Sequence, residues 1–139
     1  MAASAEQELG TAFNPKLDAN GLVTAVTVDA DTHEVLMVAF MNKAAIEKTM
    51  ETRKATYWSR SRQKFWVKGE ESGNTQEVVS MTVDCDQDAV VVTVRQKGAA
   101  CHNGFTSCFY REVIRGGNGA LELKTIAEPV LDPKQMYKK

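Results

Sequence analysis

The stretch that decides the fold is Gln76-Glu-Val-Val-Ser-Met-Thr-Val83, followed by Asp84-Cys-Asp-Gln-Asp88 and then by Ala89-Val-Val-Val-Thr-Val-Arg95. The two outer segments are rich in β-branched residues, which favour strands, and the polar segment between them is typical of a connection. We therefore predict two strands, over 76–83 and 89–95, joined by an acidic loop.

Other short segments with strand composition lie on both sides of this pair. They cover residues 22–28, 34–41, 55–60, 64–68 and 109–114, the last before a glycine turn at 116–119. A short helix is expected over 43–52, with Asn42 as its N-cap and with Ile46 and Met50 four residues apart on one face. This pattern predicts an α+β fold, a mostly β small domain with one principal helix.

Length and composition restrict the class of protein. With 139 residues, 43% hydrophobic and 25% charged, the chain fits one globular domain over 1–139, with a loose N-terminal arm over 1–20 and a C-terminal tail over 129–139. The net charge of −1 gives no general attraction to nucleic acid or to a membrane surface. The apolar run Val35–Met41 is too short to span a bilayer, and the acidic N-terminus lacks a secretory signal. We expect a cytoplasmic protein.

Three cysteines suggest a metal site. Cys85, Cys101 and Cys108 are an odd number for disulfides and one short of a closed four-cysteine zinc site. Free cysteines are often small buried apolar residues, and that reading stays open for each of them. Their polar or glycine-rich surroundings favour instead three thiolates on Zn²⁺ with a fourth position open, the pattern of a catalytic zinc.

His102 follows Cys101 directly and has two possible roles besides that of a solvated loop histidine. As a fourth ligand it would close the zinc site, although adjacent ligands are unusual. We favour a general acid or base, because the ordinary pKa of histidine suits proton transfer near neutrality. His33 lies in a predicted turn and receives no role.

Asp84, Asp86 and Asp88 form a second candidate metal site, because clustered carboxylates suit Mg²⁺. The alternative is a solvated acidic turn. In an extended segment these side chains point to one side and Cys85 to the other. A single subunit could then hardly place the aspartates and Cys85 on the same wall of one pocket. A site completed by a second subunit would bring the two kinds of ligand together.

Basic and aromatic residues alternate over 53–68, where no acidic residue occurs. Such a stretch can bind single-stranded nucleic acid, or a phosphorylated nucleotide through stacking and phosphate contacts, or can simply be a solvated strand face with core aromatics. The turn-rich loop 69–75 that follows could offer backbone N–H groups to an anion.

Taken together, these segments closely resemble phosphoribosyl-AMP cyclohydrolase, a family of histidine biosynthesis. The matching stretches are Trp58-Ser-Arg-Ser-Arg62, Trp66-Val-Lys-Gly-Glu-Glu-Ser-Gly-Asn74, Asp84-Cys-Asp-Gln-Asp88, Ala100-Cys-His-Asn-Gly104 and Ser107-Cys-Phe-Tyr-Arg111. The resemblance implies hydrolysis of the N1–C6 bond of the adenine ring in 1-(5-phosphoribosyl)-AMP. Substitution at N1 makes that ring electrophilic, which suits a three-thiolate zinc that acidifies its water only weakly.

The resemblance also implies an obligate homodimer with shared active sites. Zn²⁺ would be held by Cys85 of one subunit and by Cys101 and Cys108 of its partner, and Mg²⁺ by the three aspartates. Candidate substrate contacts are Trp58, Ser59, Arg60, Arg62, Lys68, Ser72, Gly73 and Asn74. The chain is expected to be monofunctional, since it is too short to add the pyrophosphohydrolase domain found in some members.

The main rival interpretation is a small zinc-stabilised module that binds a nucleotide or RNA, in which His102 completes a structural site. A nucleobase deaminase is disfavoured, because the His-x-Glu and Pro-Cys-x-x-Cys signatures are missing.

Overall fold

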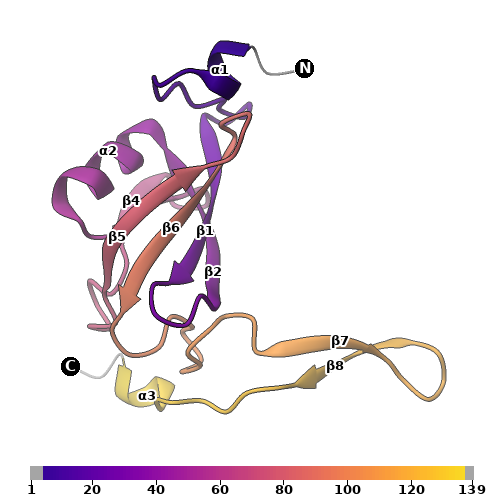
Figure 1. The fold of residues 1–139 in the computed structure, drawn as a ribbon. Coiled ribbons are helices and arrows are strands. Elements are labelled where there is room, and N and C mark those ends of the chain that lie inside the picture. Colours follow the sequence, from indigo (N-terminus) through magenta and orange to yellow (C-terminus); the bar gives the residue numbers. More distant parts are fainter. Residues whose placement is uncertain (1–4, 137–139) are drawn as a thin grey trace.

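The computed structural model describes residues 5–136, and a four-stranded sheet is its centre. The strands are β1 (Leu22–Asp29), β2 (Val35–Asn42), β5 (Gln76–Val83) and β6 (Ala89–Gln96). Their order is β2-β1-β6-β5 (Figure 1). The outer pairs are antiparallel, whereas β1 and β6 run parallel. The predicted strand pair and its acidic connection are confirmed, within one residue at the end of β6.

One face of the sheet is covered. Helix α2 (Lys43–Thr52) begins at Asn42, whose Oδ1 accepts from the Ala45 N–H at 2.8 Å, as the sequence predicted. It packs beside the hairpin of β3 (Thr56–Ser59) and β4 (Lys64–Val67). Apolar side chains of the sheet, α2 and β3 form one core. Ile46 belongs to this core, but Met50 is 40% exposed, and Thr49 takes the buried place instead.

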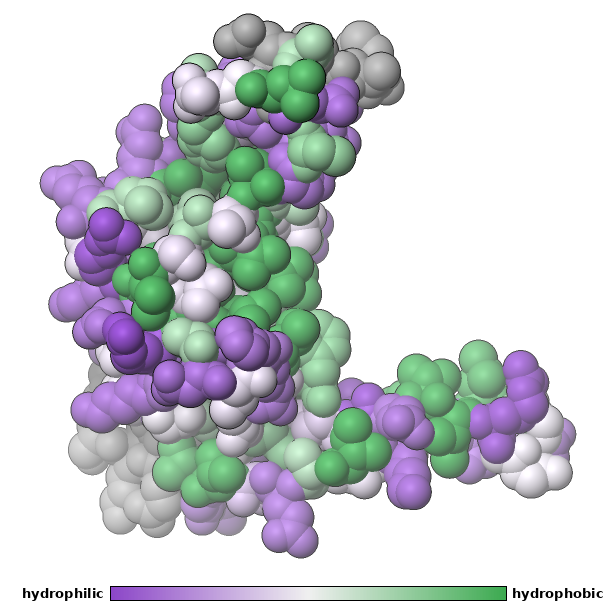
Figure 2. All heavy atoms as spheres, viewed as in Figure 1, coloured by the Kyte–Doolittle hydropathy of each residue, from purple (hydrophilic) through white to green (hydrophobic). Residues whose placement is uncertain are grey.

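The opposite face of the sheet carries a mostly apolar row, and within residues 5–136 no helix lies over it. Val38 pairs with Val26, Val26 with Val91, and Val91 with Thr82, so these four side chains cross all four strands. Paired residues point to the same face of a sheet, and this face alternates with the core residues Ala25 and Val92. Val38 and Val91 are exposed. Figure 2 shows hydrophobic side chains running down the molecule over these strands.

A second hairpin projects away from the sheet. It consists of β7 (Arg111–Arg115) and β8 (Leu121–Thr125) and extends well beyond the rest of the molecule (Figure 1). The sequence predicted a strand at 109–114 and the glycine turn, but not β8. Every residue of β8 is exposed, and the alternation of apolar and polar residues in Leu121-Glu-Leu-Lys124 is short.

Both terminal segments are attached to the ends of the sheet. The arm predicted to be loose contains α1 (Ala5–Leu9), and its Lys16 N–H donates to the Gln87 carbonyl at 2.7 Å. The tail contains α3 (Pro133–Met136), and its Leu131 N–H donates to the Gly104 carbonyl at 3.1 Å. The parts of the predicted arm and tail at 1–4 and 137–139 lie outside the described residues. Within residues 5–136, no helix has the length and apolarity needed to cross a bilayer.

Candidate functional site

The acidic loop gathers three carboxylates at the tip of the β5–β6 hairpin. One oxygen from each of Asp84, Asp86 and Asp88 lies within 4.8 Å of the other two. The segment is a tight turn rather than an extended run, because Gln87 has a φ of 60° and the Asp84 carboxylate accepts from the N–H groups of Asp88 and Ala89 at 3.0 and 3.2 Å. The turn therefore brings the aspartates together in a different way from the expected alternation.

The close approach of these carboxylates perturbs their ionisation. Hydrogen bonds with Asp84 and then Asp86, together with burial and their negative charges, raise the pKa of Asp88 to about 6. Burial opposes ionisation of Asp84, but hydrogen bonds from Asp88, Ala89 and Asp86 together lower its pKa. One carboxylate thus resists ionisation beside the others. A bound divalent cation would relieve that repulsion, and carboxylate oxygens are suitable ligands for Mg²⁺.

Gln87 holds the acidic loop, and the sequence analysis assigned it no role. Its side chain is 4% exposed, and its Oε1 accepts from the Asn14 N–H at 2.7 Å while its carbonyl accepts from Lys16. The N-terminal arm is therefore fastened to the loop that carries the aspartates. The available signal was one amide side chain in the segment 84–88, which otherwise holds three aspartates and Cys85.

Cys101 and Cys108 lie together at the other end of the sheet. The Asn103 N–H donates to Cys101 Sγ at 3.4 Å. The Cys108 N–H donates to the Leu36 carbonyl at 2.7 Å, and Ser107 Oγ donates to the Val35 carbonyl at 2.6 Å, so this segment is held against the start of β2. Cys101 is buried, whereas Cys108 is exposed.

The two thiols and Lys68 influence one another. Desolvation, followed by the charge of Cys101, raises the pKa of Cys108 to about 11, and the charge of Lys68 opposes the shift. Burial lowers the pKa of Lys68, and the charges of Cys108 and Cys101 oppose that change. Lys68 Nζ donates to the Ala100 carbonyl at 2.5 Å, immediately before Cys101 in the chain. The pair thus has a cation beside it.

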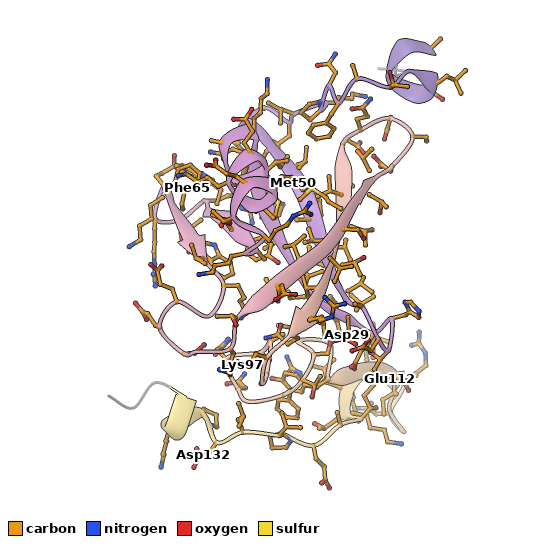
Figure 3. All side chains as sticks on the ribbon, turned by 60° about the vertical axis from the view of Figure 1, so that its left-hand side comes forward. Asp29, Met50, Phe65, Lys97, Glu112 and Asp132 are labelled. Atoms are coloured by element: carbon orange, nitrogen blue, oxygen red, sulfur yellow. The ribbon has the colours of Figure 1, made fainter. Side chains whose placement is uncertain are left out.

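Cys85 lies far from this pair within the chain. It occupies the loop before β6, and Cys101 follows β6 at its opposite end (Figure 1). A strand of 8 residues at about 3.3 Å per residue separates the two loops by roughly 25 Å. In the side-chain view, Lys97 at the end of β6 lies toward the tail that carries Asp132 (Figure 3). Across residues 5–136, the three cysteines form no common group of potential ligand atoms.

The β3–β4 hairpin and the loop after it form a cavity of about 470 Å³. Ser59, Arg62, Lys68 and Ser72, four of the eight predicted substrate contacts, line it. Acidic residues line it as well, since Glu70 and Glu71 border the same space. The cavity has the size of a small-molecule site, and its cationic groups suit a phosphate.

Other predicted contacts lie around this cavity. Trp58 and Arg60 line a second, more open hollow of about 540 Å³, where the Arg60 guanidinium lies 4.0 Å from the centre of the Phe40 ring. Gly73 is exposed, and Asn74 is buried. Within the described residues, Asn74 Nδ2 has no hydrogen-bond acceptor, so the loop holds a buried donor free for a ligand or a water.

A buried polar network, which the sequence analysis did not predict, supports this loop. The Tyr57 hydroxyl donates to Gln76 Oε1 at 2.7 Å and lies 2.6 Å from Thr27 Oγ1. Gln76 Nε2 donates to Gln96 Oε1 at 2.8 Å, and Gln96 Nε2 donates to the Asn74 carbonyl at 3.1 Å. The loop 69–75 is thereby connected to the centre of the core.

His102 lies in the turn after Cys101 and is exposed. Its neighbours hold this turn, since the Gly104 N–H donates to the Cys101 carbonyl at 3.0 Å and the Cys101 N–H to the Phe105 carbonyl at 3.1 Å. The imidazole is thus accessible to a ligand beside the cysteine pair, as an acid or base must be.

Comparison with known proteins gives a consistent result. The family model described as phosphoribosyl-AMP cyclohydrolase matches residues 37–110. A protein of that name from Nitrobacter winogradskyi is 52% identical, over 97% of this chain and 94% of its own length. Proteins of the same name from Rhodopseudomonas palustris and Bradyrhizobium diazoefficiens are 54% and 53% identical, over 95% and 98% of this chain and 89% and 97% of their own lengths.

Proposed function

This chain belongs to the phosphoribosyl-AMP cyclohydrolase family of histidine biosynthesis, and on that premise we propose that it acts as a zinc-dependent homodimer with shared active sites. The proposed reaction is hydrolysis of the N1–C6 bond of the adenine ring in 1-(5-phosphoribosyl)-AMP, in the cytoplasm. The bond, the metals and the dimer are the parts that go beyond family membership.

One observation carries the proposal: the candidate ligands are divided between the two ends of the sheet. Cys101 and Cys108 are together, and Cys85 lies on the far side of β6 with the aspartates. Two thiolates leave a zinc site incomplete, because catalytic zinc uses three protein ligands. A second copy related by twofold symmetry can bring its Cys85 to the first copy's pair and thereby complete two equivalent sites.

The apolar row on the open sheet face supports a dimer. Val38, Val26 and Val91 lie in the middle of this face, where Val38 and Val91 are exposed. A contiguous apolar surface of this kind is typical of a protein interface. The same strands end in the acidic loop and in the cysteine loop, so a copy seated on this face lies beside both.

The residues fit the two proposed metals chemically. Thiolates are suitable ligands for Zn²⁺. The three clustered carboxylates suit Mg²⁺. Zinc with an open position supplies a Lewis acid that lowers the pKa of a bound water. We assign Mg²⁺ the positioning of a substrate phosphate, ribose hydroxyls or a water.

The remaining groups bind the substrate and transfer protons. Arg62 and Lys68 border the cavity of about 470 Å³ and, with Arg60, are the proposed phosphate partners. Trp58, Ser59, Ser72, Gly73 and Asn74 are the other proposed contacts, among which Asn74 offers its unpaired buried N–H. His102 moves the proton of the attacking water or of the departing N1.

Incubation with phosphoribosyl-AMP, followed by the absorbance change of ring opening, tests the proposal. We expect turnover with zinc and magnesium and its loss on chelation, while circular dichroism still reports the strands. Unfolding on chelation would instead indicate the structural zinc of a binding module. Homopolymer RNA binding tighter than nucleotide binding would also favour that alternative.

His102→Ala should lower turnover far more than zinc content, and an equal loss of zinc would make His102 a ligand.

A further inference from the structure

The ammonium of Lys68 is fixed beside the cysteine pair. Lys68 follows β4, and its backbone N–H donates to the Ala55 carbonyl at 3.0 Å. Its side chain then reaches a carbonyl 32 positions further along the chain, that of Ala100, at 2.5 Å. Lysine loses much rotamer freedom when it is held in one place, so a specific contact at that place must offset the loss.

The contact restrains the loop that carries Cys101. The Ala100 N–H donates to the Thr106 carbonyl at 3.1 Å, and the Cys101 N–H to the Phe105 carbonyl at 3.1 Å. These bonds close the loop on itself, whereas Lys68 ties it to the β3–β4 hairpin. Without this tie, the loop would lose its side-chain link to the wall of the cavity.

The charge of Lys68 also complements the proposed zinc site. Three thiolates on Zn²⁺ leave a formal charge of −1, which is costly in a partly buried place. Lys68 is half-buried, and its charge interacts with both Cys101 and Cys108. An ammonium has three N–H donors, so the bond to Ala100 leaves donors for a substrate phosphate.

We propose that Lys68 is a positioning residue, whose ammonium holds the Cys101 loop through the Ala100 carbonyl and offsets the negative charge of Cys101 and Cys108 when they bind zinc. This rests on the proposed function for the zinc but not for the loop. Lys68 thereby connects the wall of the substrate cavity to the metal site, because the same side chain borders the cavity.

The first part of the proposal is that the charge of Lys68 favours zinc binding. Zinc affinity of the full chain, measured by competition with a chromophoric chelator, tests this electrostatic half of the proposal. Lys68→Met should weaken zinc binding roughly 10- to 100-fold, the usual effect of losing a group that supports metal ligands. Lys68→Arg keeps the positive charge, so its zinc affinity should fall clearly less than that of Lys68→Met. Lys43→Met, which removes a charge from the exposed start of α2, should bind like the wild type. Equal affinity for Lys68→Met and the wild type, or equal losses for the methionine and arginine variants, would overturn this half.

Hydrogen exchange of the metal-free chain tests the other half without zinc. Lys68→Met should speed exchange of the Ala100 and Cys101 amides, which are hydrogen-bonded within the loop, and leave the β1 amides unchanged. Unchanged loop exchange would overturn the restraint. If Lys68→Met does not fold, Lys68→Gln replaces it, with the same expectations. If the wild type binds no zinc, the proposed function fails, and the loop restraint is still decided by exchange.

Discussion

The division of the cysteines makes a quantitative prediction about mixed dimers. Cys85→Ser and Cys101→Ser should each be inactive alone, because each removes a ligand from every site. In a dimer containing one chain of each kind, one site keeps Cys85 from the second variant and the cysteine pair from the first. The other site lacks both. Mixing two inactive variants should therefore restore activity.

The size of the recovery follows from twofold symmetry. Random reassortment of equal amounts gives about half mixed dimers, each with one intact site, so about a quarter of the wild-type sites return. The assay is refolding of the variants separately and together, followed by ring opening of phosphoribosyl-AMP at equal total chain concentration. Zinc content measured on the same samples should recover in parallel.

The roughly 25 Å span of β6 excludes the alternative of a site built within one chain. A mixture of Cys101→Ser and Cys108→Ser is the matched control, because both variants damage the same half of the site and their mixed dimer contains no intact one. Recovery in that control, or none in the first mixture, would refute a site shared in this way.

Three other substitutions test particular parts of the structure. Tyr57→Phe removes the hydroxyl between Thr27 and Gln76 and should lower the free energy of unfolding by about 1–3 kcal/mol, as measured by urea denaturation; no change would mean that the network adds nothing to stability. Val26→Glu places a charge in the apolar row and should give folded, inactive monomers in analytical ultracentrifugation. An intact dimer would show that the interface does not lie on this face. Gln87→Ala removes the acceptor of the Asn14 N–H and should speed exchange of that amide far more than that of Lys16, which bonds to the backbone carbonyl; equal effects would mean that the whole arm detaches.

Local sequence patterns predicted the elements whose signal is local. The strands at 22–28 and 76–83 and the helix at 43–52 with its Asn42 cap were confirmed within a residue, since alternation and capping act between near neighbours. The parallel pairing of β1 with β6 was not predicted, because it joins segments far apart in the chain and no turn residue specifies it. β8 was missed although Leu121-Glu-Leu-Lys124 alternates apolar and polar residues after the glycine turn, because five residues give a short signal and all of them are exposed.

The residues of the candidate site could be predicted from the sequence, but their arrangement in space could not. The aspartates were expected to converge by alternation, and they converge through a turn around Gln87. The adjacency of Cys101 and Cys108 and the contact of Lys68 with Ala100 depend on how loops pack across the sheet. Residue types determine which metal a group can bind, whereas tertiary packing determines which groups meet.

The divided ligand set links assembly to metal binding in the proposed dimer. If only the assembled pair offers three thiolates, zinc binds the dimer more tightly than the separate chains, and linkage requires zinc to favour the dimer by the same factor. Burial of the apolar row favours association of the two chains. Zinc bound by a third ligand from the partner then stabilises the dimer further. In a single chain only two of the three cysteines, Cys101 and Cys108, lie together as possible zinc ligands. In the proposed dimer, the open fourth position that the odd number of cysteines suggested exists only where two chains complete one site.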